Sequence, residues 1–410
     1  MRRIWLVLLN LSLLPLGPAA AWAQGPVGPE FRVNTYTANS ESTPAIAVDP
    51  AGNFVVVWQS EGQYVNDTGI FGQRFASSGV PLGPEFRVNT YTPFDQVFPK
   101  VAADSGGNFV VVWTTRDQYG TFGFAHGQRY ASDGTSLGGE FRLNNYTKTG
   151  ASGVGTTPDG GFLALYAAEA PDDPSGTFGQ RFASSGAPVG PEFRVNSYTT
   201  GSQFGAIVAA DSAGNFVVVW VSNGQDGSSF GVFGQRYSAD SAPLGPEFRV
   251  NTYTTGHQGE PAVAASTGQF VVVWQDTFQE TEIGIFGQRF ASSGIPLGPE
   301  FRVNTAYPMT TQLYPSVAAD PDGNFVVTWE KGYLQWPQIV GQRFGSDGTP
   351  LGAEFRVNTY TTTGQHRPAV AADAAGAFIV TWTGDTTLVD VFGQRFRAMV
   401  PVELMHFGVE

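Results

Sequence analysis

Five glutamines share one position of a repeated pattern, and they are the first residues whose type and spacing suggest chemistry. They are Gln96, Gln203, Gln258, Gln312 and Gln365, and Glu41 takes the same place in the first copy. One interpretation is a circle of amide donors and acceptors that binds a polar ligand such as a sugar. The other is that each Gln holds the backbone of its own loop, since most side-chain hydrogen bonds go to backbone or water.

Six tryptophans also recur, each at the end of the second apolar segment of its repeat. They are Trp58, Trp113, Trp220, Trp274, Trp329 and Trp382. An aromatic ring can stack on a sugar, but Trp at a fixed repeat position is more typical of packing between repeats. Trp336 is different, because it lies in the variable segment 331–338. We therefore predict that Trp336, together with the five glutamines, contacts a ligand.

Carboxylates are the main candidates for catalysis and for metal binding. Glu41, Asp95, Glu260 and Glu330 lie in variable segments and could form the acid and base pair of a glycosidase or lyase. The chain has no cysteine, no Gly-x-Ser-x-Gly motif and four histidines at unrelated positions. The sequence therefore favours a protein that is not an enzyme and leaves the enzyme as the alternative.

A second set of aspartates precedes glycine-containing turns. They are Asp49, Asp104, Asp211, Asp320 and Asp373. Each turn offers one carboxylate, whereas calcium takes about six to eight oxygen ligands. Asp in this place commonly accepts hydrogen bonds from the turn backbone. We predict structural turns, with no metal and no cofactor.

Two repeated phrases must position all of these residues. Glu-Phe-Arg begins at residues 30, 85, 140, 192, 247, 300 and 354, at intervals of 52 to 55 residues. Gly-Gln-Arg, followed by Phe or Tyr, begins at residues 72, 127, 179, 234, 287, 341 and 393. Both phrases occur seven times. A period this regular indicates a repeat architecture in which each unit packs against its neighbours.

Each repeat contains four segments with the composition of β-strands. In the first repeat they are residues 44–49, 54–59, 70–76 and 85–89, separated by Gly, Asn, Ser and Pro. Val, Ile and aromatic residues dominate them, and helical periodicity is absent. Four antiparallel strands per unit, repeated seven times, predict an all-β fold, a seven-bladed β-propeller.

The first two strands of a repeat carry the pattern Pro-x-Val-Ala-x-Asp-x-x-Gly-Asn, as in residues 99–108 and 315–324. This pattern resembles the NHL-type propeller repeat. The resemblance covers only these two strands of each blade. It implies the propeller architecture and identifies no functional residue.

The order of the phrases predicts how the ring closes. Residues 30–34 precede the first group of three strands, and no equivalent follows Phe396. The last blade therefore lacks its outer strand, which would leave an unpaired edge. We predict that residues 30–34 pair antiparallel with residues 391–397. The competing segment, 400–407, is strand-like but matches no repeat.

Antiparallel order divides the loops between two faces. The loops before the first strand and between the second and third strands form what we call the divergent face, because their sequences vary, as in residues 60–68 and 222–230. The remaining turns form the uniform face, with Ala-Ser-Ser-Gly recurring at 76–79, 183–186 and 291–294. Recognition usually uses variable loops on a rigid scaffold. At the blade interfaces we expect a cluster of Arg74, Glu85 and Arg87 and their equivalents, with a solvated outer edge as the alternative.

Both ends of the chain lie outside the repeats. Residues 1–23 read as a signal peptide, with Arg2, Arg3, an apolar run and Ala21-Trp22-Ala23. A membrane anchor is the competing interpretation, but a spanning helix needs about 20 apolar residues. We expect a propeller over residues 24–397 and a tail or extra strand over 398–410. Export would place the protein outside the cell, at its surface or in the periplasm.

Charge narrows the possible partners. Without residues 1–23 the chain has 20 basic residues and 35 acidic ones, a net charge of −15. Such a surface repels nucleic acid and anionic lipid. The leading hypothesis is an exported module that binds a glycan or a protein through the divergent face. The alternatives are a polysaccharide hydrolase or lyase on the same face, and a structural surface protein; the sequence leaves the oligomeric state open.

Overall fold

The computed structural model describes residues 25–398, apart from 65–66, 117–118, 145, 147–148, 171–172, 278–282, 306–309 and 333–335. The predicted signal peptide and residues 399–410 of the predicted tail lie outside the described residues. Within the described ranges, no helix is long and apolar enough to cross a membrane.

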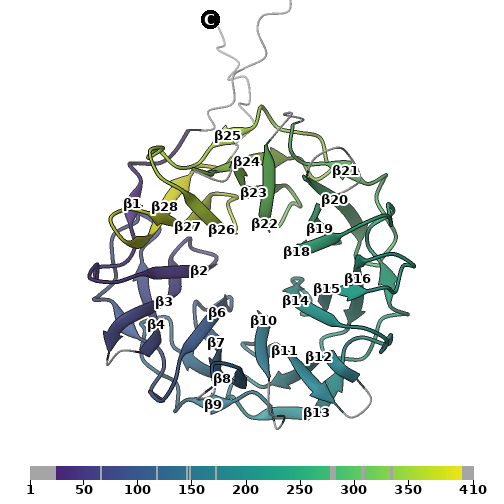
Figure 1. Cartoon of the computed structure of the whole chain (residues 1–410), viewed down its shortest axis with the longest axis horizontal. Coiled ribbons are helices and arrows are strands. Elements are labelled where there is room, and N and C mark those ends of the chain that lie inside the picture. The colour runs from purple at the N-terminus through teal and green to yellow at the C-terminus, as the bar shows by residue number, and fades with distance from the viewer. Residues whose placement is uncertain are drawn as a thin grey trace, which may run out of the picture.

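The described residues form 28 strands in seven four-stranded antiparallel sheets, arranged as blades around a central axis (Figure 1). The innermost strands are β2 (Glu41–Val48), β6 (Gln96–Ala103), β10 (Gly150–Thr156), β14 (Gln203–Ala210), β18 (Gln258–Ser266), β22 (Thr311–Ala319) and β26 (Gln365–Ala372). The second strands are β3 (Phe54–Tyr64), β7 (Phe109–Arg116), β11 (Phe162–Ala170), β15 (Phe216–Asn223), β19 (Gln269–Asp276), β23 (Phe325–Gly332) and β27 (Phe378–Asp385).

The outer half of each blade begins with the Gly-Gln-Arg strand. These third strands are β4 (Asp67–Phe75), β8 (Phe122–Tyr130), β12 (Asp173–Phe182), β16 (Phe230–Tyr237), β20 (Gly284–Ala291), β24 (Gln338–Phe344) and β28 (Val389–Phe396). The outermost strands are β1 (Phe31–Arg32), β5 (Phe86–Arg87), β9 (Phe141–Arg142), β13 (Pro188–Arg194), β17 (Phe248–Arg249), β21 (Phe301–Arg302) and β25 (Phe355–Arg356). The predicted seven-bladed propeller of four antiparallel strands per blade is confirmed.

The N-terminal strand closes the ring, as the order of the phrases predicts. β1 is the outermost strand of the sheet that contains β26, β27 and β28. Phe31 pairs with Gly393 and Arg32 with Phe392, in antiparallel register. Figure 1 shows β1 beside β28, so that the two ends of the propeller lie together. We number the blades 1 to 7 from β2 onward, and blade 7 is the one that β1 completes.

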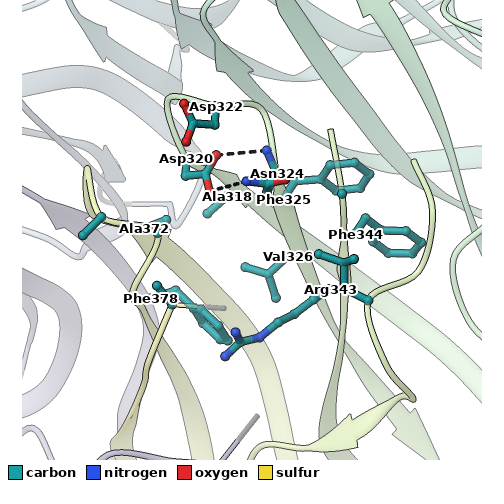
Figure 2. Close-up of a pocket in the computed structure, with 15 residues that line it drawn as sticks. Ala318, Asp320, Asp322, Asn324, Phe325, Val326, Arg343, Phe344, Ala372 and Phe378 are labelled. Carbon is teal, nitrogen blue, oxygen red and sulfur yellow. Dashed lines mark hydrogen bonds between the residues drawn. The ribbon is translucent and has the colours of Figure 1, made fainter. Parts of the chain in front are cut away.

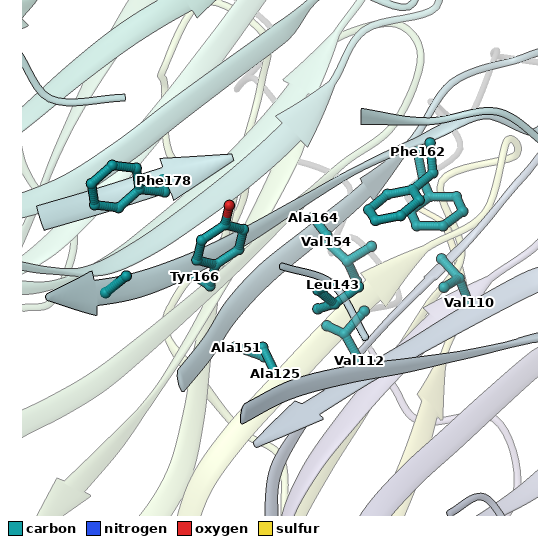
Figure 3. Close-up of a cluster of buried hydrophobic side chains, with 12 residues drawn as sticks. Val110, Val112, Ala125, Leu143, Ala151, Val154, Phe162, Ala164, Tyr166 and Phe178 are labelled. Carbon is teal, nitrogen blue, oxygen red and sulfur yellow. The ribbon is translucent and has the colours of Figure 1, made fainter. Parts of the chain in front are cut away.

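The core lies between neighbouring blades. Val110 and Val112 of β7 pack with Val154 of β10 and with Phe162 and Tyr166 of β11, which joins blade 2 to blade 3 (Figure 3). Both faces of the second strands are apolar because each blade is covered on both sides. Tyr166 takes the place that Trp holds in the other blades, and its side chain is 0% exposed.

The two repeated phrases contact each other through a glycine and an aromatic ring. A Cβ atom on Gly72 would lie 2.9 Å from the Phe86 ring, and one on Gly393 would lie 2.7 Å from the Phe31 ring. The Phe of Glu-Phe-Arg then reaches the next blade, where the Phe31 ring centroid lies 5.5 Å from that of Phe75. Glycine is required in Gly-Gln-Arg because any side chain would displace this ring.

The glutamate and the arginines of the phrases bridge blades, but through different partners from those expected. The Glu85 carboxylate accepts hydrogen bonds from the backbone N–H and hydroxyl of Thr35, at 2.7 and 2.8 Å, on the side of blade 7. Arg74 instead donates to the backbone carbonyl of Asp133 in blade 2. The expected cluster of Arg74 with Glu85 is therefore wrong, because the two side chains hold opposite interfaces of blade 1.

Candidate functional site

The five glutamines predicted to contact a ligand lie inside the protein. Gln96, Gln203, Gln258, Gln312 and Gln365 are 0 to 1% exposed. The side-chain oxygen of Gln96 accepts a hydrogen bond of 2.9 Å from Nε1 of Trp113, and its amide donates to the carbonyl of Pro93 at 3.1 Å. Gln312 and Gln365 accept from Trp329 and Trp382 at 2.7 and 2.8 Å.

In blades 4 and 5 the glutamine amide also donates a hydrogen bond to the backbone of its own loop. Gln203 donates to the carbonyl of Thr200 at 3.2 Å, and Gln258 donates to that of Thr255 at 3.1 Å. These bonds agree with the interpretation in which each Gln fastens its loop backbone. The glutamines present no surface to a ligand in this arrangement, and the function proposed below does not use them.

Glu41 occupies the glutamine position of blade 1 and is fully buried. Its carboxyl oxygens accept hydrogen bonds from Nε1 of Trp58 at 2.7 Å and from the hydroxyl of Ser60 at 2.8 Å. Burial raises the pKa of Glu41 to about 8, and the negative charges of Glu85 and Asp390 add to the shift. At neutral pH Glu41 is therefore mostly protonated. As an uncharged group it takes the place of the glutamine amide found at this position in five other blades.

We expect Glu41→Gln to remove a pH dependence from the stability. The folded-state pKa of about 8 is above the usual value of 4.5, so the contribution of the protonated group to stability is complete below pH 4.5 and is lost as the pH rises through 8. The variant should unfold at nearly the wild-type temperature at pH 5. At pH 9 it should be more stable by on the order of 4 kcal/mol. Thermal melts at both pH values check this, and parallel pH profiles for the two proteins would contradict it.

The aspartates before the turns are structural, as predicted. Asp49 accepts hydrogen bonds of 2.9 Å from the backbone N–H groups of Ala51 and Asn53 and from the Asn53 amide. With their equivalents, these turns surround a hollow of about 470 Å³ at the axis of the uniform face, lined by all seven blades. No group of three or more His, Cys, Asp or Glu suited to a metal is found among the described residues.

A second hollow, of about 440 Å³, lies between blades 6 and 7 on the uniform side (Figure 2). Arg343 is 4% exposed, and its guanidinium lies 4.4 Å from the centroid of the Phe378 ring. Burial lowers the pKa of Arg343 to about 10. Figure 2 shows this side chain directed at Phe378 and away from the turn of Asp320.

The closure of the ring changes the partner of Arg343. Arg289 donates to the backbone carbonyl of Ser346, in the turn that links the third and fourth strands of the next blade, at 2.7 Å. Blade 7 has no such turn, because its fourth strand is β1, and Arg343 donates to the carbonyl of Arg397 at 2.7 Å instead. The hollow itself is common to more than one interface, since an equivalent one of about 400 Å³ lies between blades 1 and 2, where the turn is present.

Near the divergent face, five of the seven innermost strands each contain one non-glycine residue with an unusual backbone conformation. A register shift interrupts the pairing of these strands with their neighbours, for example between Val97 and Lys100. The residues inside it with positive φ, between 48 and 57°, are Thr43, Phe98, Glu260, Tyr314 and Arg367. Each directly precedes a proline. Bulges redirect side chains, and strained backbone of this kind gathers at functional sites.

Three charged side chains lie near the axis at this end. Lys100 of β6, Glu260 of β18 and Arg367 of β26 are all exposed. Enclosure by the surrounding strands lowers the pKa of Lys100, the charge of Glu260 opposes the shift, and that of Arg367 adds to it. The guanidinium of Arg367 lies 5.2 Å from the centroid of the Tyr314 ring. Groups from blades 2, 5, 6 and 7 therefore form one axial cluster: Lys100, Glu260, Tyr314 and Arg367.

A histidine joins two carboxylates beside the axial cluster. Nδ1 of His366 lies 3.3 Å from Glu330 Oε1, and Nε2 lies 3.5 Å from Asp385 Oδ2. The hydrogen bond to Glu330 raises the pKa of His366, and Asp385 contributes further. The other Glu330 oxygen accepts a hydrogen bond of 3.4 Å from the backbone N–H of Arg367. Glu330 and His366 together support the strained backbone of the axial cluster.

The four carboxylates considered for catalysis have different surroundings. Glu41 is buried against Trp58, and Glu330 is 6% exposed. Asp95 lies 4.0 Å from the Arg116 guanidinium. Glu260 is exposed at the axis and makes no ion pair within 4.0 Å in the part of the chain that the structure describes. The structure thus brings Glu260 and Glu330 near the axis and gives Glu41 and Asp95 structural partners.

Exposed aromatic side chains are confined to the divergent face in the described part of the chain. Those exposed by more than a third are Tyr91, Phe94, Tyr119, Phe204, Trp336 and Tyr360. All six lie in loops before a first strand or between second and third strands, or at the start of a first strand. Large apolar side chains exposed on the uniform face are aliphatic, such as Val80 and Ile295. Trp336, predicted from the sequence as a ligand contact, is 61% exposed.

The sequence alone did not predict the axial cluster. Lys100 and Arg367 stand out in the sequence only as basic residues outside the repeated phrases, and Tyr314 does not stand out at all. A usable signal is the residue just before the repeated proline. It is Thr, Phe, Glu, Tyr and Arg at positions 43, 98, 260, 314 and 367, in an otherwise uniform segment.

No protein-family model matches this sequence, and neither does the sequence of any curated protein. Solved structures do match. A protein of unknown function from Dyadobacter fermentans has a TM-score of 0.54 at 8% identity, over 92% of this chain and 99% of that one. The GH93 α-L-arabinofuranosidase of Fusarium graminearum, solved with arabinobiose, has a TM-score of 0.53 at 10% identity, over 90% and 97%.

The phage phi92 endosialidase has a TM-score of 0.51 at 9% identity, over 92% of this chain and 70% of that one. At these identities the likeness shows the propeller fold alone. The resemblance of residues 99–108 to the NHL-type repeat stays an interpretation of the sequence, since no family model supports it.

Proposed function

We propose that the protein is exported and binds a glycan chain on its divergent face, above the axial cluster. The observation that carries this proposal is the segregation of exposed aromatic rings. Tyr91, Phe94, Tyr119, Phe204, Trp336 and Tyr360 all lie on that face, whereas the opposite face exposes aliphatic residues. Aromatic rings bind the apolar faces of sugars, and charged groups at the axis provide partners for hydroxyl groups.

Two of the similar structures support a glycan as the ligand. The Fusarium protein is an arabinofuranosidase and was solved with arabinobiose, and the phage phi92 protein is an endosialidase. Both are named for activities on glycans. A propeller scaffold of this kind is therefore compatible with glycan recognition, and for this chain the aromatic residues provide the specific argument.

Hydrolysis of the bound glycan is the second candidate function. The observation that favours it is Glu260, an exposed carboxylate at the axis, in the same region as a second carboxylate at Glu330 that is held by His366. Glycosidases use two carboxyl groups on either side of the scissile bond. In this scheme Glu260 faces the substrate, and Glu330 supplies the second group.

Binding is tested on the mature chain from Gln24 with a glycan array followed by calorimetry. Phe204→Ala and Trp336→Ala should each weaken binding by about tenfold, because each removes one stacking ring. Ile295→Ala, on the uniform face, is the matched control and should leave binding unchanged. The proposal fails if no glycan binds saturably, or if the control loses as much affinity as the aromatic variants.

Hydrolysis is tested on the same glycans by the release of reducing ends. Turnover that disappears in Glu260→Gln, while binding remains, would establish the enzyme. Binding without turnover in the wild-type protein would leave the binding module as the function.

A further inference from the structure

Resting on the proposed function, we infer that the glycan is acidic, and that Lys100 and Arg367 bind a carboxylate of a uronic or sialic acid residue at the axis. The exposed aromatic rings do not decide the class of sugar. The position of the basic side chains on the divergent face, and the ion pairs that they do or do not make, favour an acidic one.

The fold brings Lys100 and Arg367 to the same end of the axis from distant parts of the chain. Arg367 lies in the shifted register of β26, with φ of 51°, two residues after the strand begins at Gln365. Lys100 lies at the end of the same shift in β6, where it pairs with Val112. Glu260 of β18 takes the position that Arg367 has in β26, with φ of 48°. The innermost strands surround the axis (Figure 1), and the charges of Glu260 and Arg367 both act on Lys100.

Neither basic group is committed to a partner of its own. Among the described residues, Arg116 pairs with Asp95 at 4.0 Å, and Lys331 contacts Glu354. Lys100 and Arg367 make no ion pair within 4.0 Å in the same part of the chain. The arginines of the repeated phrases are used differently, since Arg289 and Arg395 hold backbone carbonyls of the next blade at 2.7 and 2.6 Å.

The two basic groups repel each other, which favours an anion between them. Burial is the main cause of the lowered pKa of Lys100; the charge of Glu260 opposes the shift, and repulsion by Arg367 adds to it. A ligand carboxylate would offset this repulsion and form charge-assisted hydrogen bonds with both side chains. The Arg367 guanidinium lies over the Tyr314 ring, and a guanidinium in such a cation–π contact can still donate N–H groups to a carboxylate.

Glu260 adds a second element of recognition at the same place. An ionised carboxylate only accepts hydrogen bonds, so it suits the hydroxyl groups of a sugar. It also disfavours an anion without hydroxyl groups, because such a ligand would meet its charge with nothing to donate. The axial cluster therefore matches a ligand that carries a carboxylate and hydroxyls on one ring.

The test compares sugars that differ only in charge, using the mature chain and calorimetry at low salt. The probes are trigalacturonic acid and its methyl ester, with 3′-sialyllactose and lactose as a second pair. In one of the two pairs, we expect the acid to bind at least about tenfold more tightly than its neutral partner. Lys100→Met and Arg367→Gln should each weaken binding of that acid by about tenfold and leave the neutral sugar unchanged.

Two variants make the result specific. Lys100→Arg keeps the positive group and should retain binding of the acid. Arg397→Gln removes an exposed arginine at the uniform end of β28, where its backbone carbonyl accepts from Arg343, and should have no effect. Equal affinity for acid and neutral sugar, or full affinity in Lys100→Met and Arg367→Gln, would overturn the inference while glycan binding stands. Absence of binding to all four probes and to the array would instead overturn the proposed function.

Discussion

Removing residues 25–36 should abolish cooperative unfolding of the propeller, whereas removing residues 399–410 should leave its melting temperature nearly unchanged. Both deletions take twelve residues, so they differ in place and not in length. The first removes β1, the outermost strand of blade 7, and leaves β28 with an unpaired edge.

The contacts of the N-terminal segment explain why the effect should be so large. Val33 is 2% exposed and packs in the cluster that joins blade 7 to blade 1, with Trp58 and Val391. The amide of Asn34 donates to the Asp390 carboxylate at 2.7 Å. Glu30 accepts hydrogen bonds from the backbone N–H and hydroxyl of Thr359, which follows the last strand of blade 6, at 2.6 and 2.8 Å. One short segment therefore links three blades.

Differential scanning calorimetry of both deletions provides the measurement. A sharp transition that survives without residues 25–36 would show that blade 7 closes the ring without β1. A larger loss from deleting residues 399–410 would assign the closure to the C-terminus and contradict closure by β1.

Replacing Trp274 by Ala should reduce the free energy of unfolding by about 3 to 5 kcal/mol. Its side chain is 0% exposed, between blades 4 and 5, and packs with Val219 and Val272. Its indole N–H has no hydrogen-bond partner among the described residues, so the loss is one of packing. Chemical denaturation of the variant measures the loss, whether or not a ligand is present. An unchanged midpoint would contradict the assignment of this tryptophan to the core.

Two further variants separate the contribution of packing to the free energy of unfolding from that of hydrogen bonding, and test an exposed tryptophan. Trp382→Phe removes the donor to Gln365 and leaves a buried acceptor, so it should cost about 1 to 3 kcal/mol more than Trp274→Phe. Trp336→Ala removes an exposed ring and should change stability by less than about 0.5 kcal/mol.

The repeat period accounts for what could be predicted from the sequence. Glu-Phe-Arg and Gly-Gln-Arg recur because every blade uses the same contact, a Phe ring over a glycine. Counting the phrases was therefore enough to predict seven blades and closure by residues 30–34. The capping role of Asp49 was also predictable, because its partners, Ala51 and Asn53, lie within four residues of it.

The site depended on information that a single repeat does not contain. The five glutamines looked like a polar ring because their position recurs, yet Gln96 faces Trp113, 17 residues away in the next strand. Whether a polar group points to the axis or into the blade follows from the register shift in the innermost strand. A proline marks the place of the shift in five blades, but the direction of each side chain follows from the pairing with the second strand.

Only the closed ring brings Lys100, Glu260 and Arg367 together. They belong to blades 2, 5 and 7, and each is unlike its counterparts in the other repeats, so periodicity gives no reason to group them. Their separation across the axis is set by the number of blades and by closure through β1. The sequence by itself determined the repeated contacts between neighbours, and the tertiary structure decided which of the exceptional residues share the axis, because that proximity is a property of the whole ring.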